Sequence, residues 1–184
     1  MTSLALTHSP REVQFYCLDF GGGTLSGLSG LPHVGGITGR HDLERVNRTI
    51  NEITSLITRR EHLFAQHNID SMTDFRRRRQ QNELPDEPRG DVFLVVDGWN
   101  TIKQDFPDLV PVFTLIAGRG LNYGVHLVIT ANRWSEVVTA LRDQLGTRFE
   151  LRLGDPVDSL INMRAARSVP KRPEPGSPRS CCTS

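Results

Sequence analysis

The sequence carries, at residues 91–97, the stretch Asp91-Val92-Phe93-Leu94-Val95-Val96-Asp97. It is a continuous apolar run bounded by carboxylates, and such runs are typical of a central parallel strand that is covered on both faces. A strand of this kind delivers Asp97 to its carboxyl end, where open α/β sheets place their ligand sites. The stretch therefore predicts a parallel sheet with a carboxylate at its functional edge.

The segments around this run alternate between strand and helix patterns. Further strands are predicted at residues 13–20, 125–130 and 148–153, and the last alternates strictly, as a strand near a sheet edge does. Helices are predicted at residues 42–67 with Asp42 as N-cap, and at 71–81, 107–118, 135–145 and 156–167. The glycine-rich stretch at residues 21–30 is interpreted as a flexible loop. Strands that alternate with helices imply βαβ units, so we predict an α/β fold with a mostly parallel sheet.

Composition excludes several classes of protein. The 184 residues include 22 basic and 21 acidic side chains, a net charge of +1, so no global field holds the chain on nucleic acid or an anionic membrane. No apolar run approaches the ~20 residues that span a bilayer, and the N-terminus lacks a secretory signal pattern, which predicts a cytosolic location. The three cysteines, Cys17, Cys181 and Cys182, form neither a disulfide framework nor a zinc motif. We expect one domain at residues 1–169 and a disordered Pro/Ser-rich tail at 170–184.

Asp97 is the candidate binding residue of this fold. In P-loop nucleotidases, a carboxylate at this place orders the magnesium shell through water, the arrangement called Walker B. Asn132 follows the next strand and would sense phosphate, although a turn-forming role fits it equally. Arg119 and Arg148 are candidates for arginines that act on a neighbouring subunit's nucleotide, with a solvated surface role as the alternative.

The phosphate-binding loop is missing from the sequence. It requires G-x-x-x-x-G-K-[ST], and neither Lys103 nor Lys171 follows a glycine. Gly98 stands where an active enzyme of this type usually carries a glutamate that polarises water. Catalysis is therefore compromised twice. Two other features are assigned structural roles: residues 76–79, four arginines, as a solvated helical face, and Cys17 as an inert buried thiol.

At this point the sequence resembles a known family, the FtsK/SpoIIIE-type ATPase domains of EccC, the motor of type VII (ESX) secretion systems. The resemblance covers residues 2–172. Within the family, the sequence is most similar to the second of the tandem ATPase domains, which also lacks the glutamate. The stretches that carry it are His8-Ser9-Pro10 with the strand to Asp19, Leu31-Pro32-His33-Val34-Gly35-Gly36, Gly90 to Asp97-Gly98-Trp99, Gly124-Val125-His126, and Leu145-Gly146-Thr147-Arg148 to Asp155.

The resemblance implies a RecA-like P-loop NTPase fold that uses ATP and Mg²⁺. It further implies other EccC ATPase domains and type VII membrane components as partners, WXG100-class proteins as substrates, a hexamer, and a cytoplasmic location beside the inner membrane. In the family a strand, a Walker A loop and its helix precede the His-Ser-Pro stretch. We expect residues 1–7 to be the end of that helix, so that the first strand and the P-loop are absent and the neighbouring strands keep unpaired backbone groups.

Three functions remain open at this stage. The first is a nucleotide-dependent secretion motor domain, in which Asp97 orders Mg²⁺. The second is a non-catalytic interaction module or gene remnant, which the absent lysine loop and Gly98 favour. The third is an FtsK-like DNA translocase, against which the near-neutral charge argues, so DNA is not an expected partner.

Overall fold

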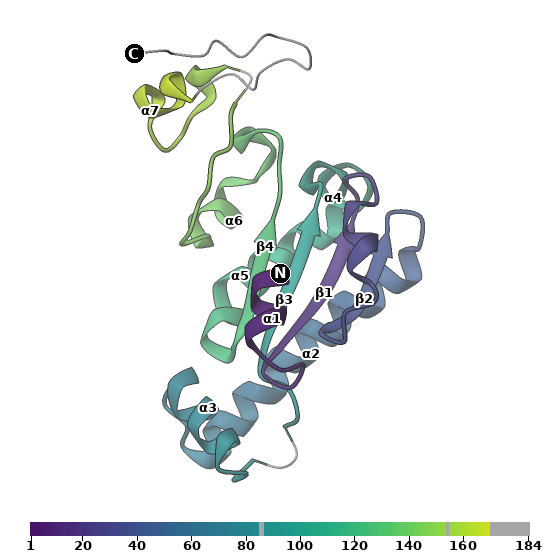
Figure 1. Ribbon diagram of the computed structural model, residues 1–184, viewed down its shortest axis with the longest axis vertical. Coiled ribbons are helices and arrows are strands. Elements are labelled where there is room, and N and C mark those ends of the chain that lie inside the picture. The colour runs from purple at the N-terminus through teal and green to yellow at the C-terminus, as the bar shows by residue number, and fades with distance from the viewer. Residues whose placement is uncertain (85–86, 154, 170–184) are drawn as a thin grey trace, which may run out of the picture. The chain divides into compact units, whose positions relative to one another are not determined.

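The computed structural model describes residues 1–84, 87–153 and 155–169. Contacts divide the chain into two units, Met1–Gly146 and Thr147–Ser184. The helices and strands of the first unit are α1 (Thr2–Thr7), β1 (Val13–Asp19), β2 (Val34–Gly39), α2 (Leu43–His67), α3 (Met72–Gln80), β3 (Asp91–Asp97), α4 (Trp99–Asp105), α5 (Val110–Arg119), β4 (Val125–Ile129) and α6 (Thr139–Gln144) (Figure 1). The second unit holds α7 (Met163–Ser168) and a 3-10 turn, Pro156–Asp158.

The sheet of the first unit is parallel throughout its four strands, in the order β2-β1-β3-β4. β3 lies between β1 and β4, as its continuous apolar run predicts. The register places Asp19 opposite Asp97 and Val96 opposite Ile129. The predicted α/β fold with a parallel sheet is confirmed, and the carboxyl ends of β1, β3 and β4 meet at one edge.

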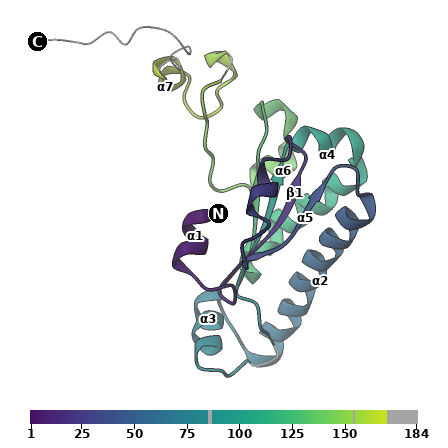
Figure 2. The same ribbon diagram turned by 45° about the vertical axis from the view of Figure 1, so that its right-hand side comes forward.

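Both faces of the sheet are covered by apolar side chains. Figure 2 shows α2 along one side of the strands and α1 on the other. The larger core joins alternate residues of β1 and β3 to buried positions of α2 and α5, while the smaller core joins the intervening residues to α1. On the α1 side, Phe15 and Cys17 are buried against Leu4 and Ala5. This two-sided burial explains why the strands are apolar runs without alternation.

Helix α2 follows the prediction closely. The Asp42 side chain accepts a hydrogen bond from the backbone N–H of Arg45, and Asn68 ends the helix in a left-handed conformation. The predicted apolar face is buried except for Leu43, which is more than half exposed. The residues of α2 that are buried are Val46, Ile50, Ile53, Leu56, Ile57, Arg60 and Phe64.

Arg60 is a fully buried cation on this otherwise apolar face. Its Nη1 donates to the Tyr123 carbonyl at 2.7 Å, and its Nη2 donates to the carbonyls of Arg89 and Gly90 at 2.8 and 2.7 Å. The buried Glu87 carboxylate lies 3.3 Å from the same Nη2. Burial lowers the pKa of Arg60 and Glu87 partly offsets this, but a guanidinium stays protonated in proteins. Arg60 therefore ties α2 to the segments that lead into β3 and β4.

Several predicted elements differ in the structure. Residues 148–153 form no strand, because no other strand hydrogen-bonds to them among the described residues, and Phe149 and Leu151 are each 86% exposed. The helix predicted at 135–145 shortens to α6 after a 3-10 turn, and the one predicted at 156–167 breaks into a 3-10 turn and α7. Strand β2 and helix α4 were not predicted. The tail predicted to be disordered lies outside the described residues.

The four arginines of α3 match the predicted solvated face only in part: Arg76 and Arg77 are exposed, but Arg76 and Arg79 also bond to residues outside the helix. Asp91 accepts two hydrogen bonds from the Arg76 guanidinium, and Asp74 forms ion pairs with Arg77 and Arg78. Arg79 donates to three backbone carbonyls. Arg76 and Arg79 thus hold α3 to the loops around the amino ends of the strands, whereas Arg77 and Arg78 pair with Asp74 of the same helix.

We expect Arg60→Lys to lower the free energy of unfolding by about 3 kcal/mol, because a lysine ammonium cannot reach the carbonyls of Tyr123 and Gly90 together and leaves Glu87 poorly paired. Urea unfolding followed by circular dichroism measures the change. The matched control is Arg59→Lys on the same helix, where the half-exposed side chain pairs with Glu87 from the surface and the loss should stay below about 1 kcal/mol. Equal losses in the two variants would contradict the role given to Arg60.

Candidate functional site

The carboxyl ends of β3 and β4 bring Asp97 and Thr130 into contact. The Thr130 hydroxyl donates to Asp97 Oδ1 at 2.6 Å and accepts from the Gly98 backbone N–H at 2.9 Å. The strand pairing continues through this point, because the Thr130 N–H donates to the Val96 carbonyl. Thr130 therefore fixes the rotamer of Asp97 and connects it to the turn that follows β3.

The Asp97 carboxylate also faces the glycine loop that follows β1. A Cβ on Gly21 would overlap Asp97 Oδ2, so the carboxylate lies directly against a backbone that only glycine allows. Thr24 points its hydroxyl at the same oxygen, at 3.4 Å. Both oxygens of Asp97 thus have a hydroxyl neighbour, while the residue stays partly exposed.

Asp19, the last residue of β1, holds this loop through hydrogen bonds to its backbone. It is 7% exposed, and its two oxygens accept the backbone N–H groups of Gly23 at 3.0 Å and Leu25 at 2.8 Å. These bonds start the 3-10 helix Thr24–Leu28, so the stretch predicted to be a flexible loop is a turn held by a buried carboxylate. Its effect on the site is to bring Thr24 to Asp97.

Gly98 has a backbone conformation in which any side chain would be strained. Its φ is +85°, and a Cβ there would lie 3.0 Å from the Gly21 nitrogen and from the Phe20 carbonyl carbon. The glutamate that polarises water in active enzymes of this type would need this position. In this turn a glutamate would therefore be strained by its positive φ and by contact with the neighbouring backbone.

The oxygen atoms at this edge suit the magnesium ion of a bound magnesium–nucleotide complex. Mg²⁺ is usually held through one or two carboxylates, waters and substrate phosphates, and Asp97 with its hydroxyl neighbours fits that pattern. Among the described residues no group of three or more metal-binding side chains exists, so an ion here would depend on water and phosphate for its other ligands. Lys103 lies in the last turn of α4 and Lys171 lies outside the described residues, and the sequence supplies no lysine from a phosphate-binding loop.

The other predicted site residues lie elsewhere. Asn132 is exposed and donates its backbone N–H to Glu136, while Thr130 is the residue of this segment whose side chain contacts Asp97. Arg119 ends α5 and pairs with Glu61 of α2, near the amino end of β4 and therefore at the edge opposite Asp97. Arg148 belongs to the second unit and is exposed. Their proposed action on a neighbouring subunit stays a prediction.

Three site residues were not singled out from the sequence: Asp19, Thr24 and Thr130. The signal for Thr130 was present, since it is the first polar residue after the apolar run of β4 and the parallel register aligns it with the end of β3. Thr24 could not be found this way, because its position depends on the turn that Asp19 holds.

Comparisons with known proteins identify the family of this chain. Residues 1–176 match the FtsK/SpoIIIE family. The chain is 52% identical to the ESX secretion system protein EccC of Thermomonospora curvata over 180 residues, which are 97% of this chain and 14% of that protein. It is 46% identical over 172 residues to the ESX-1 secretion system protein EccCb1 of Mycolicibacterium smegmatis, covering 92% of this chain and 29% of the relative.

A solved structure of T. curvata EccC (ATPases 2 and 3), in complex with a signal sequence peptide, superimposes with a TM-score of 0.89 at 52% identity. It covers 92% of this chain and 31% of that one. The predicted resemblance to EccC ATPase domains and the predicted RecA-like fold are confirmed. The chain spans less than a third of the length of these relatives. No described helix has both the length and the apolar character to cross a membrane.

We expect Gly98→Ala to lower the free energy of unfolding by about 1–2 kcal/mol, because a Cβ at φ +85° is strained and meets the Phe20 backbone. Gly98→Glu should lose at least as much and gain no ATP hydrolysis. Chemical denaturation measures both. Gly27→Ala is the matched control, since its Cβ would meet nothing within 4 Å and its change should stay within about 0.5 kcal/mol. A Gly98→Ala variant as stable as the control would show that the turn relaxes.

We expect Cys17 to resist thiol reagents while the chain is folded. It is fully buried, and burial, with a smaller contribution from Asp19, raises the pKa of its thiol to about 11. At about pH 8 the thiolate fraction is then roughly a thousandth, against roughly a quarter for an ordinary thiol. In a Cys181→Ser/Cys182→Ser background, labelling by a disulfide reagent should be about 100-fold slower in buffer than in urea. Similar rates in both conditions would mean that Cys17 is accessible.

Proposed function

The chain belongs to the FtsK/SpoIIIE family, and from that premise we propose that it acts as an EccC-like ATPase domain of a type VII secretion system that does not hydrolyse ATP by itself. The observation that carries the proposal is the Asp97–Thr130 pair beside Gly98. The pair supports a magnesium-binding role, while Gly98 and the missing lysine loop argue against hydrolysis by this chain alone.

The residues of this edge have separate roles in the proposal. Thr130 holds Asp97 in one rotamer. Asp97 would then accept hydrogen bonds from the waters of a bound magnesium ion. When bound, the ion neutralises charge on the nucleotide phosphates. Gly98 offers no carboxylate to take a proton from an attacking water. The chain would therefore bind the magnesium side of a nucleotide and leave its phosphates without a protein cation from a P-loop.

The partners follow from the relatives. We propose that the chain associates with other EccC ATPase domains and with the membrane components of the secretion system, on the cytoplasmic side of the inner membrane. WXG100-class proteins are the proposed substrates, and a hexamer is the proposed assembly. Arg119 and Arg148 remain candidates for contacts with a neighbouring subunit's nucleotide in that assembly. Because the chain spans 14% of EccC and 29% of EccCb1, energising export requires domains beyond it.

A non-catalytic interaction module is the second candidate. The turn at Gly98 favours it, because it carries no general base and a side chain there would be strained, while the fold stays intact. A DNA translocase is less favoured, since a net charge of +1 offers little phosphate neutralisation, and salt-dependent binding to duplex DNA would be needed to support it.

We expect the isolated chain to release no more phosphate from MgATP than the Asp97→Asn variant does, because the lysine loop and the catalytic glutamate are both missing. A phosphate-release assay at saturating MgATP tests this. Turnover by the wild-type chain that the Asp97→Asn variant lacks would contradict the proposal.

Association with sister domains separates the two candidates. With the cytoplasmic domain of T. curvata EccC as bait, the proposed ATPase role predicts that MgATP strengthens binding, because the bait would supply the phosphate contacts that the isolated chain lacks, and that Asp97→Asn removes this effect. Binding that is unchanged by MgATP and by Asp97→Asn would identify an interaction module instead.

A further inference from the structure

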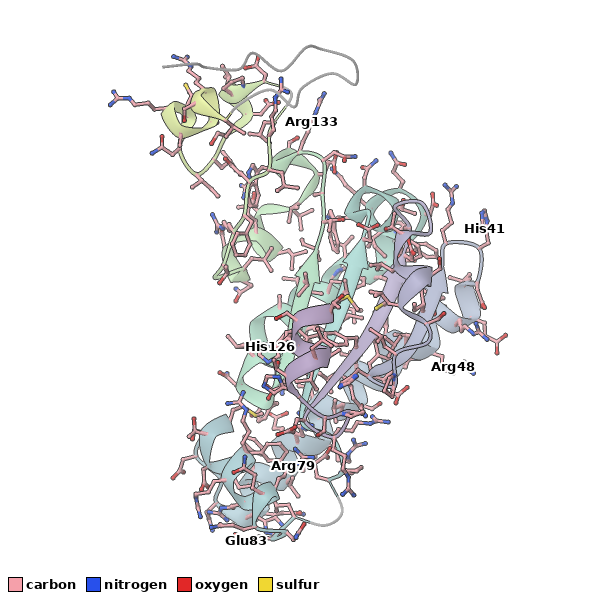
Figure 3. The ribbon with its side chains drawn as sticks, viewed as in Figure 1. His41, Arg48, Arg79, Glu83, His126 and Arg133 are labelled. Atoms are coloured by element: carbon pink, nitrogen blue, oxygen red, sulfur yellow. The ribbon has the colours of Figure 1, made fainter. Side chains whose placement is uncertain are left out.

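A concave region lies at the edge of the sheet opposite Asp97. It is a cavity of about 690 Å³ at the amino ends of β1 and β3, with walls from α1, α3 and the loops before both strands. Figure 3 labels His126 on β4 and Arg79 on α3, and both line it. A strand of seven residues separates this cavity from the Asp97 edge by about 20 Å. The cavity is therefore independent of the nucleotide site.

The carboxylates in the cavity wall already have partners. Asp91 accepts two hydrogen bonds from Arg76 at 2.8 Å and lies 2.9 Å from His126 Nε2. Burial would raise the pKa of Asp91, but the hydrogen bonds from His126 and Arg76 outweigh it and hold this pKa well below its usual range. Glu87 pairs with Arg60 and Arg59. The backbone N–H and the hydroxyl of Ser9 donate to Glu12 at 2.8 Å.

Two cations of the wall have no such partner. Arg79 donates to the carbonyls of Glu87, Arg11 and Pro88 at 2.9–3.1 Å, and no carboxylate of the described residues lies within ion-pair distance of it. Burial lowers the pKa of Arg79, and the neighbouring Arg11 charge lowers it further, while the charges of Glu87, Asp91 and Glu12 partly offset this. The side chain of Arg11 makes no hydrogen bond or ion pair with the described residues. Two like charges therefore face one cavity and neither forms an ion pair with a described residue there, although the charges of Glu87, Asp91 and Glu12 act on Arg79 from beyond ion-pair distance.

We propose that this cavity binds an oxyanion group, a carboxylate or a phosphate, between Arg11 and Arg79. A planar guanidinium matches both groups, and an anion placed between two repelling cations relieves their repulsion. The volume lies in the range of ligand pockets and exceeds that of a single ion. Leu4, Val13, Leu84 and Phe93 provide apolar wall beside the cations, so the oxyanion belongs to a larger ligand with an apolar part.

The test is a titration of the ¹⁵N-labelled chain with citrate and, separately, with inorganic phosphate, at constant ionic strength. We expect saturable shifts of the Arg79 Nε–H and the His126 amide with at least one anion. The tighter of the two assigns the group as carboxylate or phosphate. Arg11→Gln should weaken this binding about tenfold or more, since it removes a charge-assisted contact. The matched control, Arg48→Gln, removes an exposed arginine of α2 and should bind as the wild type does.

A second variant keeps the proposal falsifiable without disturbing Arg79. Arg11→Glu provides a carboxylate beside Arg79 within the chain, so it should abolish the anion-dependent shifts and melt at a higher temperature than Arg11→Gln in low salt. The proposal is overturned if neither anion gives saturable shifts at these residues, or if Arg11→Gln and Arg11→Glu bind with wild-type affinity. It does not depend on the proposed function, because ATP binding and hydrolysis are not read in this experiment.

Discussion

The hydrogen bonds of the buried Arg60 guanidinium are the interactions on which the placement of the strands depends. It binds the carbonyl of Gly90, one residue before β3, and the carbonyl of Tyr123, two residues before β4. Helix α2 thereby sets where both strands begin. In a parallel sheet the register is carried along the strands, so the same bonds decide which residues meet at the far edge. Val92 pairs with Val125 at one end, and Thr130 consequently reaches Asp97 at the other.

The two edges of the sheet carry different chemistry. At the carboxyl edge, a partly exposed carboxylate is held by hydroxyls over a glycine backbone, which suits the hydrated side of a magnesium ion. At the amino edge, arginines of α3 and the loop before β1 gather around loops and carboxylates. The polar residues at each edge are separated by an apolar sheet that is buried on both faces. The effect of a substitution at one edge can therefore be measured without a direct change in contacts at the other edge.

The sequence allowed the parallel sheet, helix α2 and Asp97 to be predicted because long apolar runs and helical spacing are strong local signals. Strand β2 carries three glycines and no apolar run, and it forms because β1 offers its edge. At residues 148–153 a strand was predicted that does not form. The apolar and polar residues alternate there, but no pairing strand is present among the described residues. The contact of Thr130 with Asp97, and the partners of Arg60 and Arg79, join residues more than 30 positions apart or depend on loop paths. No local pattern reports such contacts.

The central claim is our proposal that Asp97 and Thr130 form the magnesium side of a nucleotide site, in a sequence that contains no G-x-x-x-x-G-K-[ST] loop to bind the phosphates. Equilibrium dialysis of the 184-residue chain against radiolabelled ATP with excess Mg²⁺ tests it most directly. The account predicts no saturable binding at concentrations up to about 1 mM, a limit that corresponds to about 4 kcal/mol of binding free energy. Saturable, stoichiometric binding in the micromolar range would contradict it.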